Sequence, residues 1–461
     1  MTSLSAALLS AAGAAAAVGR VRAVDSLSPP DLVFFAQSAA SAARGEGFAQ
    51  TALRFDHGGL TTSVHLSPWR LAHALAHATG DDPAAAVALQ GALLGPVFLL
   101  LRALLGGRGA GPTLGALALA LHPLCLSLLL CDLRPITTML PGGLLLLVGL
   151  RAPRPQLGVA LAGALLCALA REEALYVILA MAALPLSRLA RRPAAALAGA
   201  LVCAVGAAGA AALPLLVWGR LDNIDTNANL AGELVAIAEG QRPLLRWPQA
   251  THFGLRALIG APAALLHPAA WPAAGAWLFL AALSALEPLA PGHGGLHYLA
   301  VCAPGLLGGA ALALRGRLGP RGGALSLALA LAAGAPEWPD QLRWLWVGLG
   351  GPDARAAEGA ALTGPVRAQP GPVVTDPRAA PLLSTLPVLH LQGHFSGDAQ
   401  TVEAALSEAR WVLLPTGLRL PDPAEAAAWA GALSARGCHE EAQAATLGLS
   451  RWSCPPPRPD R

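Results

Sequence analysis

The sequence of 461 residues contains no lysine, so all 31 of its basic residues are arginines. The absence of lysine excludes Schiff-base chemistry and a P-loop lysine. Charged residues are also scarce, at 13% of the chain against about 25% in an average soluble protein. Together with a hydrophobic share of 55% and a mean hydropathy of +0.54, this scarcity excludes a disordered chain or a soluble globule and predicts a multi-pass membrane protein.

Other familiar signatures are missing as well. The chain has no G-x-S-x-G, H-E-x-x-H, P-loop or Rossmann motif, and its net charge of +4 is too small and dispersed to indicate nucleic acid as a partner. Five of the seven cysteines lie in or beside apolar segments, and none has zinc spacing. Cys438 and Cys454 lie in the polar tail and are a disulfide candidate if that tail is in an oxidising compartment.

Apolar runs predict an α-helical membrane domain over residues 1–335 with about eleven spanning helices. The predicted spans are 4–19, 84–104, 111–130, 136–150, 156–170, 174–188, 194–218, 251–267, 270–286, 297–314 and 322–335. The first span lacks a basic flank before it, which favours an uncleaved anchor over a signal peptide.

The arginines predict the orientation of these spans. They follow the second, fourth, sixth and tenth spans, and those four loops fall on one side by parity, which the positive-inside rule makes cytoplasmic. The N-terminus is then cytoplasmic, and segments 20–83, 219–250 and 336–461 lie outside the cytoplasm. Four arginines are exceptions to this pattern and fall outside: Arg20, Arg22, Arg134 and Arg171. Arg134 and Arg171 are the more notable, because both fall in short outer turns.

The last of these segments, 336–461, reads as a small α/β domain. Apolar β-branched runs predict strands at 373–376, 388–391 and 411–414, and helical spacing marks 399–409 and 422–436.

Acids, histidines and arginines occur together only in the outer turns, whereas the inner turns carry arginine and almost no acid. Turns between helices are polar in any case, and alternate turns must lie on the same side of the membrane. The informative feature is therefore the difference in residue types between the inner and the outer turns. It predicts a polar, partly buried site at the outer membrane face. The residues concerned are Asp31, His57, His65, Asp132, Arg134, Arg171, Glu172, Glu173, Glu287, His293 and His297.

Five short elements resemble those of a bacterial family of predicted membrane proteins of unknown function. Residues 31–37 read Asp-Leu-Val-Phe-Phe-Ala-Gln where the family has Asp-Leu-Gly-x-Phe-x-Gln, and 65–68 read His-Leu-Ser-Pro for His-Phe-Ser-Pro. Residues 131–134 read Cys-Asp-Leu-Arg for Phe-Asp-Phe-His, 171–173 read Arg-Glu-Glu for Lys-Glu-Asp, and 296–298 read Leu-His-Tyr for Tyr-His-Tyr. The family is similar to the GT-C superfamily of glycosyltransferases, whose donors are sugars on polyprenyl phosphate.

The resemblance implies a GT-C-like fold and transfer of a hexose or pentose, with inversion, from a polyprenyl-phosphate carrier to a glycan, lipid or protein acceptor. It places Asp31 as the general base, because GT-C enzymes use an acid in the first outer loop. Arg134 and Arg171 would bind the lipid phosphate through their planar guanidinium groups. His65, Asp132, Glu172, Glu173 and His297 would complete the substrate site.

The resemblance leaves some questions open. No cofactor is established, and a divalent metal held by Asp31 and His65 is one alternative, since GT-C enzymes include metal-dependent and metal-independent members. The implied location is the bacterial cytoplasmic membrane. Two other functions fit the same residues: a transporter or lipid flippase, and a non-catalytic membrane scaffold. The lack of a second acid beside Asp31, Val33 in place of glycine and Arg134 in place of histidine keep the scaffold as an alternative.

Overall fold

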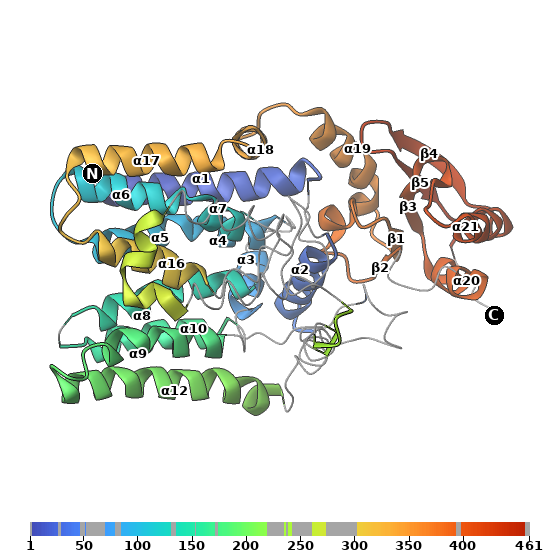
Figure 1. Cartoon of the computed structure of the whole chain (residues 1–461). Helices are drawn as coiled ribbons and strands as arrows, with labels where there is room; N and C mark the ends of the chain where they lie inside the picture. Colours follow the sequence, from blue (N-terminus) through green and yellow to red (C-terminus); the bar gives the residue numbers. More distant parts are fainter. Residues whose placement is uncertain are drawn as a thin grey trace.

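A computed structural model gives the architecture of the chain (Figure 1). The structure describes residues 2–25, 29–46, 51, 70–78, 84–130, 135–152, 154–170, 174–218, 235–236, 238–241, 261–272, 302–392 and 398–456.

A bundle of helices forms one end of the molecule, and an α/β domain forms the other (Figure 1). The helices described in and beside the bundle are α1 (Thr2–Arg22), α2 (Pro29–Ala43), α3 (Arg70–Ala78), α4 (Ala85–Ala92), α5 (Leu94–Leu105), α6 (Ala110–Ala120), α7 (Pro123–Leu129), α8 (Met139–Leu150), α9 (Leu157–Ala168), α10 (Ala174–Met181), α11 (Ala183–Leu186), α12 (Pro193–Trp218), α16 (Ala303–Ala313), α17 (Pro320–Gly334) and α18 (Trp338–Gly348).

Stripes of exposed leucine identify the bundle as the membrane domain. Leu157, Leu161 and Leu165 on α9 are each 44–54% exposed and follow one another at four-residue spacing. Leu197 and Leu201 on α12 repeat the pattern. Contiguous apolar surface of this kind needs lipid rather than water around it, so the chain is a helical membrane protein.

The predicted number of spans stays a prediction. Three helical segments of the described chain are long and apolar enough to cross a membrane, Thr2–Arg22, Ala85–Leu105 and Pro193–Leu213. α6 and α7 would make a fourth span, bent by 55° at their junction. Three further predicted spans, 136–150, 156–170 and 297–314, contain α8, α9 and α16. Each of these helices is apolar but shorter than the three spanning segments.

Small residues let the helices approach closely. α8 packs on α9, where a Cβ added at Gly142 would lie 2.9 Å from the backbone nitrogen of Cys167. α1 packs along α18 in the same way, and a Cβ added at Gly19 of α1 would overlap the backbone carbonyl of Trp344. Close backbone contact replaces the hydrophobic effect as the packing force between helices in lipid.

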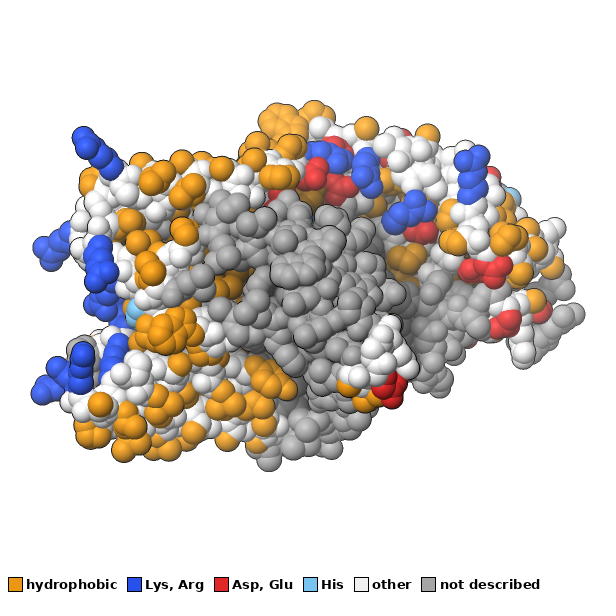
Figure 2. Space-filling view, viewed as in Figure 1, with side chains coloured by type: hydrophobic (Ala, Val, Ile, Leu, Met, Phe, Trp, Pro, Cys, Tyr) orange, Lys and Arg blue, Asp and Glu red, His pale blue; other side chains and the backbone are white. Residues whose placement is uncertain are grey.

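The arginines gather at the end of the bundle farthest from the α/β domain (Figure 2). The ends of α5, α8 and α16 meet there: Arg151 after α8 donates to the carbonyl of Ala103 in α5, and Gly316 after α16 donates to the carbonyl of Leu105 at 3.1 Å. Arg188 after α11 joins them by donating to the carbonyls of Leu150 and Ala152, each at 2.9 Å. The arginine-bearing loops that parity places on one side therefore meet at one end.

The α/β domain contains a five-stranded sheet of order β2-β1-β3-β5-β4. β1 runs parallel to β2 and β3, and β5 runs antiparallel to β3 and β4. Its elements are α19 (Ala354–Ala368), β1 (Val373–Thr375), β2 (Leu389–Leu391), α20 (Ala399–Glu408), β3 (Trp411–Pro415), α21 (Pro423–Arg436), β4 (His439–Ala444) and β5 (Leu449–Ser453).

The predicted strands and helices of this domain are confirmed at β1, β2, β3, α20 and α21. β4 and β5 were not predicted. β4 (His-Glu-Glu-Ala-Gln-Ala) is mostly exposed and carries no apolar alternation that would indicate a strand. The alternation of β3 puts Val412 on the face covered by α20 and α21, and Leu413 on the face toward the bundle.

A disulfide joins Cys438 to Cys454, the two cysteines that the sequence offers as a pair. Their Cα atoms are 4.2 Å apart, and the bond closes the open end of the β4–β5 hairpin. Such a bond fits the predicted location of this domain outside the cytoplasm.

Replacing both cysteines with serine should lower the free energy of unfolding of the α/β domain by about 3 kcal/mol, the loop-closure value for a loop of about 15 residues. Urea unfolding of the full chain, followed by near-ultraviolet circular dichroism, measures the change. Dithiothreitol should produce a similar loss in the wild type and none in the double variant. Equal stability of wild type and variant without reductant would show that the bond adds nothing.

Candidate functional site

α2 carries the 31–37 element and lies between the helical bundle and the α/β domain (Figure 1). Its two faces enter different cores. Leu32 and Phe35 are buried in the core of the bundle. Val33 and Phe34 are buried in the core of the α/β domain, which also contains Leu389 of β2. The side chain of Val33 therefore fills the second core.

Gln37, the last residue of the element, fixes α2 to the sheet. Its side-chain nitrogen donates to Oγ1 of Thr51 at 2.9 Å and to the carbonyl of Leu386 at 3.2 Å. The backbone nitrogen of Thr51 donates back to Gln37 Oε1 at 2.9 Å. Thr51 Oγ1 in turn accepts from Leu389 N of β2 at 2.8 Å, and the carbonyl of Thr51 is 3.2 Å from Nδ1 of His390. Both ends of the segment 37–51 are thus held on the α/β domain.

Asp31 lies in the first turn of α2, after two prolines that suit the start of a helix. Its side chain is outside the described part of the chain. The N-terminal turn of a helix carries a partial positive charge, which favours the ionised form of a carboxyl group placed there. The position therefore suits a carboxylate that accepts a proton.

The C-terminal end of α1 is built as a Schellman motif. Asp25 N donates to the Arg20 carbonyl and Val24 N to that of Val21, each at 3.1 Å. Val24 occupies the left-handed region, with φ of 57°, where a β-branched residue is strained. Its side chain is buried in the core of the α/β domain, which stabilises this strained turn.

Arg20 is a buried cation beside this turn and is only 2% exposed. It donates to the carbonyl of Leu130 at the end of α7, and its guanidinium carbon is 5.4 Å from the ring of Trp344. Sequence reasoning noted no role for Arg20. The available signal was that Arg20 directly follows an apolar span on the side where the positive-inside rule disfavours arginine.

Asp25 links α1 to the helices that lead into the α/β domain. It pairs with Arg343 of α18 at 2.8 Å and with Arg355 of α19 at 2.6 Å, and it accepts from Trp344 Nε1 at 3.1 Å. Arg343 also binds Asp353, the N-cap of α19, at 2.7 Å. Its hydrogen bond lowers the pKa of Asp353, so this network persists unless the solution is strongly acidic. The network orients the domain that holds α2.

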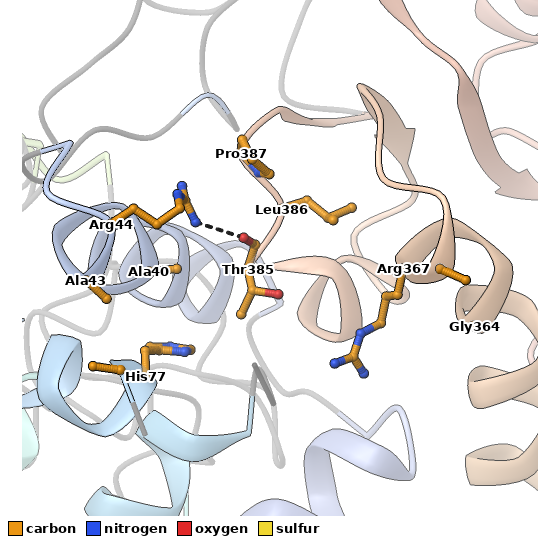
Figure 3. A pocket seen from close by; sticks show the side chains of 11 residues that line it. Ala40, Ala43, Arg44, His77, Gly364, Arg367, Thr385, Leu386 and Pro387 are labelled. Atoms are coloured by element: carbon orange, nitrogen blue, oxygen red, sulfur yellow. Dashed lines mark hydrogen bonds between the residues drawn. The ribbon is translucent and has the colours of Figure 1, made fainter. Parts of the chain in front are cut away.

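A cavity of about 940 Å³ lies between α2, α3 and α19 (Figure 3). Arg44 follows α2, and it donates to the carbonyl of Thr385 at 3.1 Å and pairs with Glu46 at 2.8 Å. His77 of α3 and Arg367 of α19 line the other walls. The described lining residues of the cavity include two arginines and a histidine and no acid, although Glu46 pairs with one of the arginines.

The other predicted site residues, His65, Asp132, Arg134, Arg171, Glu172, Glu173 and His297, lie outside the described residues, as do His57, Glu287 and His293. Their convergence on one site stays a prediction. In the part of the chain that the structure describes, no group of three or more His, Cys, Asp or Glu side chains is arranged to hold a metal ion. That part includes neither His65 nor the Asp31 side chain.

No protein-family model and no curated protein matches this chain. Among solved structures it is similar to the crystal structure of the Archaeoglobus fulgidus oligosaccharyltransferase, which was tethered through a disulfide bond to an acceptor peptide containing the NVT sequon. The TM-score is 0.44 and the identity 12%, over 93% of this chain and 71% of that one. The likeness is too distant to carry an argument.

Proposed function

We propose that this chain is an integral membrane glycosyltransferase of GT-C type, acting on the outer side of a bacterial cytoplasmic membrane. It transfers a sugar from a polyprenyl-phosphate carrier to a glycan, lipid or protein acceptor, with inversion at the anomeric carbon. One observation carries the proposal: α2, whose first turn contains Asp31, is buried between a membrane bundle and a separate α/β domain.

This position suits a reaction between a lipid-borne donor and an acceptor outside the membrane. The donor reaches the site from the bundle side, and the acceptor from the side of the α/β domain. The acceptor oxygen attacks the anomeric carbon while Asp31 takes the proton of the hydroxyl group. The bond from the anomeric carbon to the phosphate oxygen breaks, and the lipid phosphate leaves with the electron pair.

The remaining polar residues are assigned by the same chemistry. Arg134 and Arg171 neutralise the departing phosphate through bidentate hydrogen bonds. His65, Asp132, Glu172, Glu173 and His297 bind and orient the sugar. If a divalent metal takes part, Asp31 and His65 are the residues that would hold it. The basic cavity beside α2 is assigned to the acceptor.

The test compares the glycans and glycolipids of cells with and without the gene by mass spectrometry. We expect the deletion to lose one specific saccharide and to accumulate the polyprenyl-linked donor, and the wild-type gene to restore the product. An unchanged set of saccharides would contradict the proposal. A product that is still made but retained on the cytoplasmic side would instead identify a transporter or flippase.

A further inference from the structure

The end of the bundle opposite the α/β domain concentrates positive charge without acidic partners. The four stretches 83–131, 135–171, 174–221 and 288–336 contain no Asp or Glu. Ten arginines within them stand in the last turn of a helix, in the loops that follow α5, α8, α11 and α16, or in the first turn of α17. They are Arg102, Arg108, Arg151, Arg154, Arg188, Arg191, Arg192, Arg315, Arg317 and Arg321. Arg171 and Arg220, which also belong to these stretches, lie outside the described residues.

Three of these arginines form a defined group, here named the inner arginine cluster: Arg151, Arg188 and Arg315. Arg151 donates to the carbonyl of Ala103 in the last turns of α5. Arg188 donates to three carbonyls at the end of α8, including that of Arg151 at 2.9 Å. Arg315 lies beside Gly106, where an added Cβ would be 3.3 Å from its Nε.

These contacts neutralise the cluster only in part. The carbonyl ends of helices provide about half a negative charge each, whereas every arginine carries a full positive charge. Burial, and then the charge of Arg315, lower the pKa of Arg151. A guanidinium has five N–H donors, and the described contacts of Arg151 use one of them. The cluster can therefore donate to a further anion.

The surroundings favour a lipid as the source of that anion. Leu186 and Leu189 flank Arg188 and are 45% and 43% exposed, so an acyl chain can pack beside the guanidinium groups. Figure 2 shows apolar surface continuing directly from the arginine-rich end along the bundle. A free phosphate ion would use the arginines and leave this apolar surface uncovered.

We propose that the inner arginine cluster is a binding site for the phosphate of an anionic phospholipid. The headgroup lies against Arg151, Arg188 and Arg315, at the meeting point of α5, α8, α11 and α16, and its acyl chains lie along the exposed leucines. The bound lipid phosphate links these helix ends, because the stretches that carry the three arginines contain no acidic residue with which the arginines could pair. This inference does not depend on the glycosyl transfer proposed above.

The test reconstitutes the full chain in vesicles of phosphatidylcholine with and without phosphatidylglycerol and counts the retained lipids by native mass spectrometry. The wild type should retain phosphatidylglycerol preferentially. Arg315→Gln should weaken this binding about fivefold, which corresponds to the roughly 1 kcal/mol of one arginine at an anionic membrane surface. Arg315 suits the test because the described contacts show no hydrogen bond from it that holds a helix end.

Arg108→Gln is the matched control, since Arg108 is exposed at the same end outside the cluster. It should retain phosphatidylglycerol as the wild type does. Equal losses in the two variants would overturn the proposal in favour of diffuse attraction to the membrane. No preference for phosphatidylglycerol in the wild type would overturn it too. So would displacement of the lipid by millimolar inorganic phosphate, which would identify a simple ion site.

Discussion

Asp31→Asn should lower the rate of sugar transfer by about 10²- to 10⁴-fold, the usual contribution of a positioned general base. Asparagine keeps the shape of the side chain and still suits the start of a helix, so α2 should form as before. Donor binding should change little, because the base acts on the acceptor. Single-turnover transfer by the purified full chain in vesicles, with melting temperature measured in parallel, separates lost chemistry from lost structure.

Glu403→Gln provides the control for this experiment. Glu403 is exposed on α20 of the α/β domain and does not line the cavity assigned to the acceptor. Its replacement removes the same charge without touching the proposed base or that cavity, and the variant should transfer sugar at close to the wild-type rate. If Asp31→Asn is as active as Glu403→Gln, Asp31 is not the base. The scaffold or transporter function would then gain support.

Gly19→Ala should destabilise the membrane domain by about 1–3 kcal/mol, the typical cost of overpacking a tight contact. A Cβ at Gly19 would overlap the backbone carbonyl of Trp344, and a main-chain atom cannot move without displacing α18. α18 also carries Arg343, which binds Asp25, so the substitution should loosen the attachment of the α/β domain to α1. Thermal unfolding in detergent, followed by tryptophan fluorescence, measures the loss.

Gly209→Ala is the matched control for the tight contact. Gly209 lies within α12, and no atom stands within 4 Å of a Cβ built on it. Alanine is the better helix former by about 1 kcal/mol, so this variant should be as stable as the wild type or slightly more so. A Gly19→Ala protein as stable as Gly209→Ala would mean that α1 and α18 do not pack as closely as described.

Local patterns in the sequence were enough for the membrane character and much of the α/β domain. Apolar runs predicted the helices of the bundle because lipid imposes long stretches without charge. Continuous apolar runs rich in β-branched residues predicted β1, β2 and β3, which are buried on both faces. The edge strand β4 escaped prediction because exposed residues such as Glu440 and Gln443 leave no periodic signal.

The sequence by itself determined which segments are apolar, where the arginines stand and which two cysteines can pair. Only the tertiary structure decided that Val33 and Leu32, adjacent in the chain, belong to different cores. It also decided that Arg20 supports the carbonyl of Leu130, and that Arg151, Arg188 and Arg315 meet at one end of the bundle. The physical reason is that these contacts join residues far apart in the chain. Periodicity encodes which face of an element is buried, and the tertiary fold selects the partner on that face.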